Sequence, residues 1–500
     1  MAEHRNLVLA SVLIGMLMSA IDTTIVILAL PTITDELHAP FLDTIWVILI
    51  YLLVLAALTT QLGRLGDIYG RGRLFNLGFL VFIIGSAASG FAPDVFFLIG
   101  ARGFQGFGAA LLQANSNAIV ADHFPPHERG KAFGITSMGW TIGGALGIVL
   151  GGIITTFIGW RFIFYINVPV GLIGFLFALR YIRDDKRTET TIDYTGTAIL
   201  VTLLSLISYG AVEIAGNGVQ PLNLALVLVG IAMLIPFVLV ERKARDPVIV
   251  LKAFKERVLT FSLLAATLQA VGYLSVLFIL IMYLQGIRGF SPLDSSLLLV
   301  PGYIISSFLA PKMGKLSDKF GPRVVASTGI FMMAAGVLIY LLMGVNTTLY
   351  LVIAGSIVTG FGGAMFWPSN NSAVMSGAPR ELYGSISGLL RTLSNIGTLF
   401  SYVIAISIAA LSVPRYVAFE VFLGVTKLQG GVSAKFLVGI HATLIASFAI
   451  LIVAGLSSLV KSRKTETIKC CVNTHEEINQ DTGSHHENSS AGHHSWSEFI

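Results

Sequence analysis

The sequence has little charge and almost no cysteine. Asp, Glu, Lys and Arg make up 12% of its 500 residues and apolar residues 55%, and the mean hydropathy is +0.81. A soluble domain of this length needs far more charge to cover its surface, so the composition excludes a water-soluble protein. The two cysteines, Cys470 and Cys471, are adjacent, so no disulfide framework can form. We interpret them as free thiols, and acylation at the inner leaflet, close behind Lys464, is the alternative.

Common enzyme signatures are also missing. The chain has no Walker lysine loop, no HExxH motif and no nucleophile elbow, so we expect neither an enzyme nor a cofactor. The polar tail 461–500 has few large apolar residues and is predicted to be disordered and cytoplasmic. Nothing fixes the geometry of its histidines, so we expect no metal site at His485, His486, His493 and His494.

Long apolar runs dominate the rest of the chain. A helix that spans a bilayer needs about 20 apolar residues, and about fourteen segments meet this requirement. They lie near residues 7–31, 41–62, 74–92, 95–121, 133–157, 162–182, 195–214, 221–240, 259–284, 293–312, 324–344, 349–373, 383–411 and 436–460. The sequence therefore predicts an all-α polytopic membrane protein, with the first run kept as a helix and not removed as a signal peptide.

The basic residues gather on one side of the predicted helices. Alternating the segments from a cytoplasmic N-terminus puts 25 of the 32 Lys and Arg residues in the cytoplasm, five outside and two, Arg102 and Arg391, inside helices. This asymmetry follows the positive-inside rule. It predicts a multi-pass protein of the cell membrane with both termini in the cytoplasm, and it accounts for the net charge of +5 without a nucleic-acid partner.

A short charged loop occurs twice, about 250 residues apart. The run 63-GRLGDIYGRGR-73 follows the second segment, and 314-GKLSDKFGPR-323 follows the tenth. Such a repeat indicates two halves of similar build, with the seventh and eighth segments inserted between them. We therefore predict an N-terminal six-helix bundle (1–183), a linker with two inserted helices (184–257) and a C-terminal six-helix bundle (258–460).

Each repeated loop combines two glycines with one aspartate and a following arginine. Glycine permits tight turns, and an aspartate before a helix is attracted by the N-terminal dipole of that helix. The arginines can bridge to these carboxylates or to the other bundle. We predict that the loops switch the conformation through Gly63, Asp67, Gly70, Arg71, Gly314, Asp318, Gly321 and Arg323. Simple capping together with membrane anchoring is the alternative.

One carboxylate lies clearly inside a predicted membrane helix. Asp22 lies nine residues before Pro31, roughly 13 Å below the outer end of its helix, and Arg102 lies roughly 10 Å deep on a helix that enters from the same side. Intramembrane carboxylates are costly and need a partner or a task. We predict that Asp22 takes and releases a proton and that Arg102 tunes it. A static ion pair is the alternative.

The fifth segment is rich in glycine. Gly143, Gly147 and Gly151 are spaced four residues apart and share one helix face, and Gly152 follows directly. Small residues at this spacing let two helix backbones approach closely. We predict that these glycines pack the fifth helix against a neighbour.

Several polar residues inside the helices are typical of a cavity lining. We expect a small-molecule substrate to contact Gln113, Asn117, Gln269, Tyr273 and Arg391, although some of these side chains will only bond helix to helix. Three aromatic residues are interpreted instead as lipid-facing or packing groups, namely Trp140, Phe278 and Trp367.

Three motifs together resemble a known family. The first repeated loop matches G-x-L-a-D-r-x-G-r-k at Gly63, Leu65, Asp67, Gly70 and Arg71. The fourth segment matches l-x-x-x-R-x-x-q-G-x-g-a-a at Leu98, Arg102, Gln105, Gly106, Gly108, Ala109 and Ala110. The first segment matches D-x-T-i-v-n-x-A-L-P at Asp22, Thr24, Ile25, Val26, Ala29, Leu30 and Pro31. Over residues 5–460 the chain resembles the major facilitator superfamily, and within it the fourteen-helix branch of drug:proton antiporters.

The resemblance implies a major facilitator fold and proton-driven export of amphipathic drugs or toxic compounds by alternating access, in a protein that works as a monomer. One motif departs from the family pattern, because 143-GGALGIVLGG-152 has Ile148 where the antiporter motif has proline. Losing the proline removes a helix bend and weakens the inference of exchange. A proton-coupled symporter that imports a solute is therefore an alternative. A non-transporting sensor or assembly partner on the same fold is another, which the intact motifs in both halves disfavour.

Overall fold

A computed structural model describes residues 2–182, 191–244, 247–248, 256–290, 292–378, 383–412 and 431–460. The elements of these residues are helices, and no strand occurs among them. In chain order they are α1 (Ala2–Glu36), α2 (Phe41–Thr44), α3 (Trp46–Tyr69), α4 (Arg71–Gly90), α5 (Val95–His123), the short η1 (Pro126–Glu128), α6 (Arg129–Phe157), α7 (Phe162–Tyr165), α8 (Asn167–Tyr181), α9 (Tyr194–Asn217), α10 (Pro221–Ala232), α11 (Leu234–Lys243), α12 (Arg257–Met282), the π-helical η3 (Tyr283–Ile287), α13 (Pro292–Phe320), α14 (Pro322–Tyr340), α15 (Tyr350–Gly377), α16 (Tyr383–Ser412) and α18 (Gly431–Ser458). The tail 461–500, with its cysteines and histidines, lies outside the described residues.

The predicted all-α membrane fold is confirmed. Among the described residues, 13 helical segments are long and apolar enough to cross a bilayer. The segment predicted at 383–411 is not among them. It forms α16, which is 30 residues long and runs beside α3 and α12.

Two predicted segments are broken in the structure. The segment predicted at 162–182 divides into α7 and α8 at Ile166, and the segment predicted at 221–240 divides into α10 and α11 at Met233. In both cases a proline stands three residues after the break, at Pro169 and Pro236. A proline has no N–H to bond the carbonyl four residues earlier, and its ring clashes with that carbonyl, so the regular helix is interrupted there.

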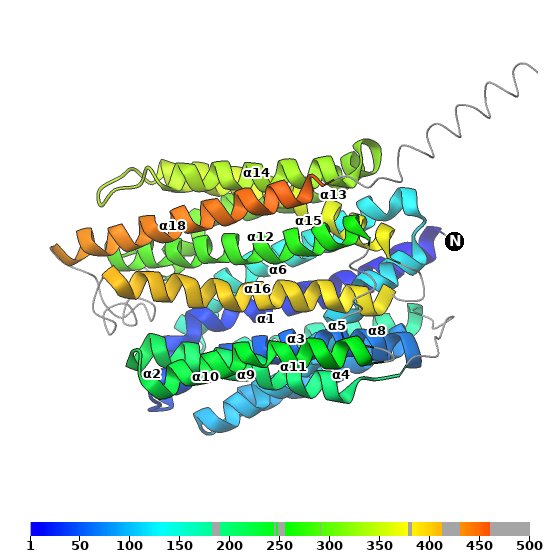
Figure 1. The fold of residues 1–500 in the computed structure, drawn as a ribbon, viewed down its shortest axis with the longest axis horizontal. Helices are drawn as coiled ribbons and strands as arrows, with labels where there is room; N and C mark the ends of the chain where they lie inside the picture. Colours follow the sequence, from blue (N-terminus) through cyan, green and yellow to red (C-terminus); the bar gives the residue numbers. More distant parts are fainter. Residues whose placement is uncertain are drawn as a thin grey trace, which may run out of the picture. The chain divides into compact units, whose positions relative to one another are not determined.

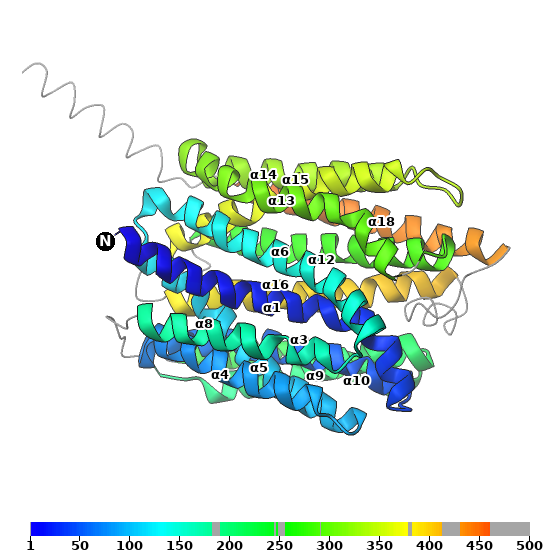
Figure 2. The same ribbon diagram turned by 180° about the vertical axis from the view of Figure 1, so that it is seen from behind.

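The helices of residues 2–459 form one compact unit. Figures 1 and 2 show α13, α14, α15 and α18 on one side of this unit and α3, α4, α5 and α8 on the other, with α1, α6 and α16 between them. The two groups meet where α6 packs on α13 and where α16 packs on α3 and α5. The division at 183 and 257 stays a prediction, because the contacts join both groups into a single unit.

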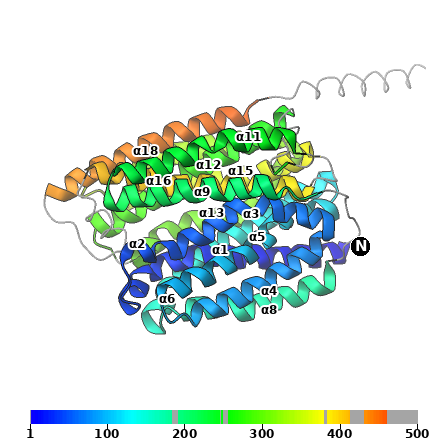
Figure 3. The ribbon, with the colours of Figure 1, turned by 60° about the horizontal axis from the view of Figure 1, so that its bottom comes forward.

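The inserted helices lie beside the line where the two groups meet. Helix α9 packs on α10, α3 and α16, and Figure 3 shows it running along α16. The inserted helices therefore lie along the outer side of the contact between the two groups and do not separate them.

One end of the unit carries the start of α1 and the α3–α4, α5–α6 and α13–α14 connections, and we call it the basic end. It is marked by Arg64, Arg71, Arg73, Arg129, Lys131, Lys315, Lys319 and Arg323. The opposite end is the far end. Each repeated loop has its turn at one glycine only, at Gly70 with φ 110° and at Gly321 with φ 89°. Gly63 and Gly314 lie within α3 and α13, so the expectation that they also form turns is wrong.

Helix α3 continues past the predicted end at residue 62 because its charged residues have partners. Arg64 donates to the carbonyl oxygen of Pro247, and Asp67 is joined to Arg71 by a contact of 2.7 Å. Burying charges without partners is costly, and these contacts let the helix run on to Tyr69.

Candidate functional site

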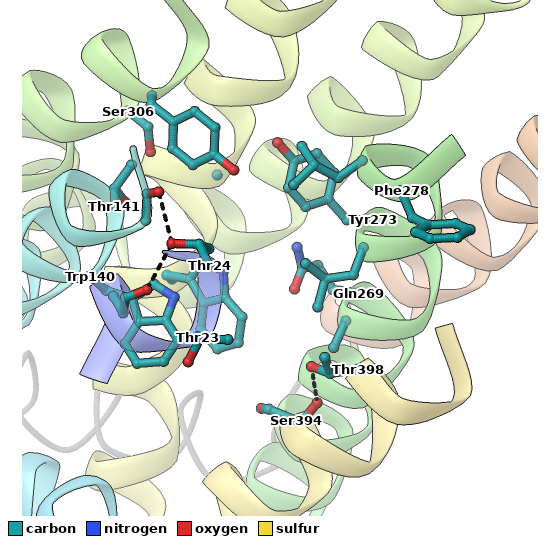
Figure 4. Close-up of a pocket in the computed structure, with 18 of the residues that line it drawn as sticks. Thr23, Thr24, Trp140, Thr141, Gln269, Tyr273, Phe278, Ser306, Ser394 and Thr398 are labelled. Carbon is teal, nitrogen blue, oxygen red and sulfur yellow. Dashed lines mark hydrogen bonds between the residues drawn. The ribbon is translucent and has the colours of Figure 1, made fainter. Parts of the chain in front are cut away.

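A cavity of about 300 Å³ lies among the helices of residues 2–459. Residues of α1, α3, α5, α6, α9, α12, α13, α14, α15 and α16 line it, so both groups of helices contribute. Figure 4 shows Thr24, Trp140 and Thr141 on one side and Gln269 and Tyr273 on the other. The volume lies near the lower end of the range of about 300–1,000 Å³ found for small-molecule sites.

Four of the five predicted cavity residues line this cavity. They are Gln113 on α5, Gln269 and Tyr273 on α12, and Arg391 on α16. Asn117 does not line it. It lies one helical turn from Gln113 toward the basic end and is 1% exposed.

The aromatic residues were misjudged from the sequence. Trp140, Phe278 and Trp367 all line the cavity, which corrects their interpretation as lipid-facing or packing groups. Trp140 shares its side of α6 with Thr136, Gly144 and Ile148, which also line the cavity. This face could have been found in the sequence, because the same four-residue spacing runs one position after the glycine row.

The cavity is closed toward the basic end where α3 meets α16. Along α3 the lining runs from Ile45, directly before the helix, to Leu55. One turn further on, the Thr60 backbone N–H and hydroxyl both bond to the Thr392 hydroxyl, at 3.2 and 3.0 Å. A Cβ added at Gly388 would lie 2.7 Å from the carbonyl oxygen of Thr59, so the two backbones are nearly in contact.

A second closure joins α6 to α13 at the basic end. The carboxylate of Asp318 accepts hydrogen bonds from the backbone N–H groups of Gly130 at 3.0 Å and Lys131 at 3.2 Å. A Cβ added at Gly314 would lie 2.1 Å from the carbonyl oxygen of Gly130. Asp318 therefore caps the N-terminus of α6. The sequence predicted instead that it caps α14, the helix that follows it, and this prediction is wrong. No ion pair between Arg323 and Asp318 occurs in the described part of the chain.

The first repeated loop is held together by its own charges. Arg71 contacts Asp67 at 2.7 Å and also pairs with Asp122 near the end of α5. Its guanidinium lies 5.9 Å from the ring centroid of Tyr383 on α16, and Arg129 donates to the hydroxyl of that tyrosine at 3.0 Å. The predicted Asp67–Arg71 bridge thus lies beside the contact between the two groups of helices.

Asp22 and Arg102 meet in the structure. Arg102 Nη1 donates to Asp22 Oδ2 at 2.6 Å, and the side chains are 1% and 0% exposed, respectively. Asp22 Oδ1 accepts from Gln105 Nε2 at 2.8 Å and from Asn167 Nδ2 at 3.2 Å. Arg102 also stacks on Tyr51, with its guanidinium carbon 4.3 Å from the ring centroid. Three side chains from α5 and α8 therefore hold one carboxylate of α1.

Helix α1 presents Asp22 and the cavity on different faces. Ala20, Thr23 and Thr24 line the cavity, whereas Asp22 does not. A change in the bonds of Asp22 therefore reaches the cavity indirectly, through a movement of α1 or through Arg102, which also donates to the carbonyl oxygen of Val47 on α3 at 3.1 Å.

The glycine row of α6 packs against the backbone of α1. A Cβ added at Gly143 would lie 2.5 Å from the carbonyl oxygen of Leu17, and one at Gly147 would lie 2.6 Å from that of Ile21. Gly151 continues the row, 2.8 Å from the carbonyl oxygen of Ile25 by the same measure, while Gly152 faces Leu293 of α13. Such close approach is typical of membrane helices with small residues at four-residue spacing, so α1 and α6 are expected to move together.

The described residues contain no group of three or more His, Cys, Asp and Glu side chains arranged to hold a metal ion.

Comparisons with known proteins agree with this architecture. Residues 12–402 match the family model described as Major Facilitator Superfamily. The chain is 32% identical to the riboflavin transporter RibZ of Clostridioides difficile (strain 630), over 79% of this chain and 86% of the relative. It is 32% identical to the puromycin resistance protein pur8 of Streptomyces alboniger over 78% of each chain. It is 29% identical to the multidrug transporter protein MdtP of Bacillus subtilis (strain 168), over 80% of this chain and 74% of that protein.

A solved structure shows the same fold. The human organic anion transporter MFSD10 (TETRAN) superposes with a TM-score of 0.58 at 14% identity, over 89% of this chain and 99% of that one. The proteins of this family are transporters and not enzymes, as predicted from the sequence. The family match, the relatives and the fold agree with the motifs at Asp22, Asp67 and Arg102, and the chain belongs to the major facilitator superfamily.

Proposed function

We propose that this membrane transporter exports amphipathic small molecules across the cell membrane in exchange for protons, by alternating access. The similarity to proteins named for multidrug transport and puromycin resistance supports export. The similarity to a riboflavin transporter supports a cavity that takes ring-containing molecules.

One observation carries the proposal, namely a cavity that is shared by both groups of helices and closed at the basic end. The basic residues at this end support its placement in the cytoplasm in this proposal, by the positive-inside rule. The closures at Thr60–Thr392 and Asp318–Gly130 then separate the cavity from the cytoplasm. Opening them and closing the far end would expose the same residues to the cytoplasm, as alternating access requires.

Protonation of Asp22 provides the coupling in this proposal. The ionised carboxylate accepts bonds from Arg102, Gln105 and Asn167. A proton on the carboxyl group removes its charge and turns one acceptor into a donor, which weakens the hold of α5 and α8 on α1. Since α1 and α6 pack closely along the glycine row, both helices are then free to move together against α13.

The test uses inverted membrane vesicles that contain the full chain. The vesicles are energised with acid inside, and uptake is followed for three fluorescent dansyl compounds: anionic dansylglycine, neutral dansylamide and cationic dansylcadaverine. We expect uptake of at least one dye to rise on energisation and to collapse with a protonophore. We expect an Asp22→Asn variant to bind the dye and let it equilibrate but not to concentrate it.

Asp35→Asn is the matched control, because Asp35 is an exposed carboxylate at the far end of the same helix. It should concentrate the dye like the wild type. If Asp22→Asn still accumulates dye against a gradient, the proton role of Asp22 is wrong. If dye leaves energised inverted vesicles together with protons, the importing symporter is the correct function.

A further inference from the structure

The described lining of the cavity carries charge of one sign only. Among the described residues that line it, Arg391 is the only one with an Asp, Glu, Lys, Arg or His side chain. The remaining polar groups are hydroxyls and amides, of which Gln113, Gln269, Asn371 and Asn395 are examples. The lining therefore carries one positive charge and no negative charge.

Among the described residues, Arg391 has no partner for that charge. Its Nε is buried and has no hydrogen-bond partner, and no ion pair of this residue occurs in the described ranges. Its closest ring contact is with Trp140 across the cavity on α6, with the guanidinium carbon 5.8 Å from the ring centroid. The neighbouring side chains on α16 do not compensate it, because Ser394 donates to its own helix at Leu390 and Asn395 carries no charge.

An arginine in this position stays charged and presents a planar set of five N–H donors. At membrane depth a cation without a counter-charge is costly. A ligand with an acidic group supplies the counter-charge and two parallel hydrogen bonds. A cationic ligand in the same cavity meets a like charge that no carboxylate neutralises.

The rest of the lining fits a flat apolar body. Trp140, Phe278, Trp367 and Tyr303 present aromatic rings from four different helices, and aromatic rings stack on planar ligands. Amide atoms without a partner are available for further hydrogen bonds at Gln113, Gln269 Oε1, Asn371 Oδ1 and Asn395 Nδ2.

We propose that the cavity selects amphipathic organic anions, with a carboxylate, sulfonate or phosphate group bound to Arg391 and an apolar ring system against the aromatic residues. This assignment rests on the proposed transport function, whose substrate class it names.

The test measures binding to the detergent-solubilised full chain by energy transfer from tryptophan to the dansyl group. Dansylglycine, dansylamide and dansylcadaverine share one ring system and differ in charge. We expect the wild type to bind dansylglycine roughly ten- to hundred-fold more tightly than dansylcadaverine, since a hydrogen-bonded charge is gained in one case and a repulsion in the other. Taurine and ethanolamine phosphate conjugates of dansyl distinguish sulfonate and phosphate from carboxylate.

Two substitutions assign the preference to Arg391. Arg391→Gln should lower dansylglycine affinity at least tenfold and leave dansylamide affinity within about threefold, and Arg391→Lys should keep the preference for the anion. Arg180→Gln, at an exposed position on α8, is the control and should bind like the wild type.

The proposal is overturned if the wild type binds dansylcadaverine as tightly as the anionic dyes, or if Arg391→Gln retains full dansylglycine affinity. If Arg391→Gln also loses its affinity for dansylamide, the variant is misfolded. The order of the three dye affinities in the wild type then tests the proposal. The binding assay needs no proton gradient, so it can succeed or fail independently of coupled uptake. Protonophore-sensitive uptake of a cationic dye would support the exporter and contradict the preference for anions. Anion binding through Arg391 without coupled uptake would support the preference for anions and contradict the proton-driven exporter.

Discussion

The contact between Asp318 and the start of α6 is the part of the basic-end closure that can be altered most simply. In an Asp318→Asn variant the side chain keeps its size but loses its charge. One amide oxygen can still accept from Gly130 or Lys131, whereas the amide nitrogen cannot accept the other N–H. The variant should therefore favour the state in which the basic end is open.

The magnitude follows from the two bonds. A hydrogen bond to a charged group contributes about 1.5–3 kcal/mol, and a negative charge at a helix N-terminus contributes about 0.3–1 kcal/mol. Asp318 is exposed, so water screens part of both terms, and we expect a loss of about 1–2 kcal/mol. This corresponds to a change of roughly 5–30-fold in the equilibrium between closed and open.

The assay measures how quickly a membrane-impermeant maleimide reaches a cysteine in the cavity from the basic end. Ser137→Cys on α6 is the reporter, because Ser137 lines the cavity, and Cys470 and Cys471 are replaced by serine. We expect inverted vesicles with Asp318→Asn to label roughly 5–30-fold faster. Gly314→Ala should act in the same direction and more strongly, since the added Cβ would lie 2.1 Å from a backbone oxygen that cannot rotate away.

Unchanged labelling in both variants would refute the reasoning, as would an equal increase in Asp35→Asn at the far end. In that case the hydrogen bonds of Asp318 form without affecting access to the cavity.

Two further predictions concern the packing of the helices. Gly143→Ala should lower the melting temperature of the detergent-solubilised protein, by a loss of about 1–3 kcal/mol from overpacking against Leu17. Gly144→Ala is its control, because the nearest atom to the added Cβ is 3.6 Å away, and a lower melting temperature for this variant alone would contradict the assignment. Thr60→Val and Thr392→Val should each speed labelling of the Ser137→Cys reporter, and a double-mutant cycle should show a coupling of about 0.5–1 kcal/mol. Additive effects would mean that the bond between the two hydroxyls does not contribute to closure.

The sequence predicts the helices well because bilayer thickness fixes how many apolar residues each one needs. The ends of the helices are predicted less well, because a segment predicted from hydropathy ends at the first charged residue. Helix α3 goes on through Arg64 and Asp67 since Pro247 and Arg71 bind those charges. Pro247 belongs to a distant part of the chain, which a window along the sequence does not contain. Arg71 lies only four residues after Asp67, but a hydropathy scale counts both charges against the helix and does not count their pairing.

The candidate site, too, is predicted only in part from the sequence. The depths of Asp22 and Arg102 could be compared because each is counted from the end of its own helix. The sequence does not predict the partner of Asp318. Its carboxylate bonds to Gly130 at the start of α6, and the crossing of α6 and α13 sets that contact. Trp140 differs from Asp318, because its place in the cavity lining can be read from the sequence. The glycine row packs on α1 and so fixes the rotation of α6, and the four-residue spacing of Trp140, Gly144 and Ile148 runs beside that row.

The separation of Asp22 from the cavity lining has a consequence for the electrical work of transport. In the proposed cycle Asp22 binds the proton outside the cavity, so the substrate does not have to be a cation that competes with the proton for this carboxylate. Export of a monoanion against entry of one proton therefore moves two positive charges inward per cycle. Each charge is worth about 2.3 kcal/mol at 100 mV, so a membrane voltage of this size, with no pH gradient, could sustain a concentration ratio on the order of 10³.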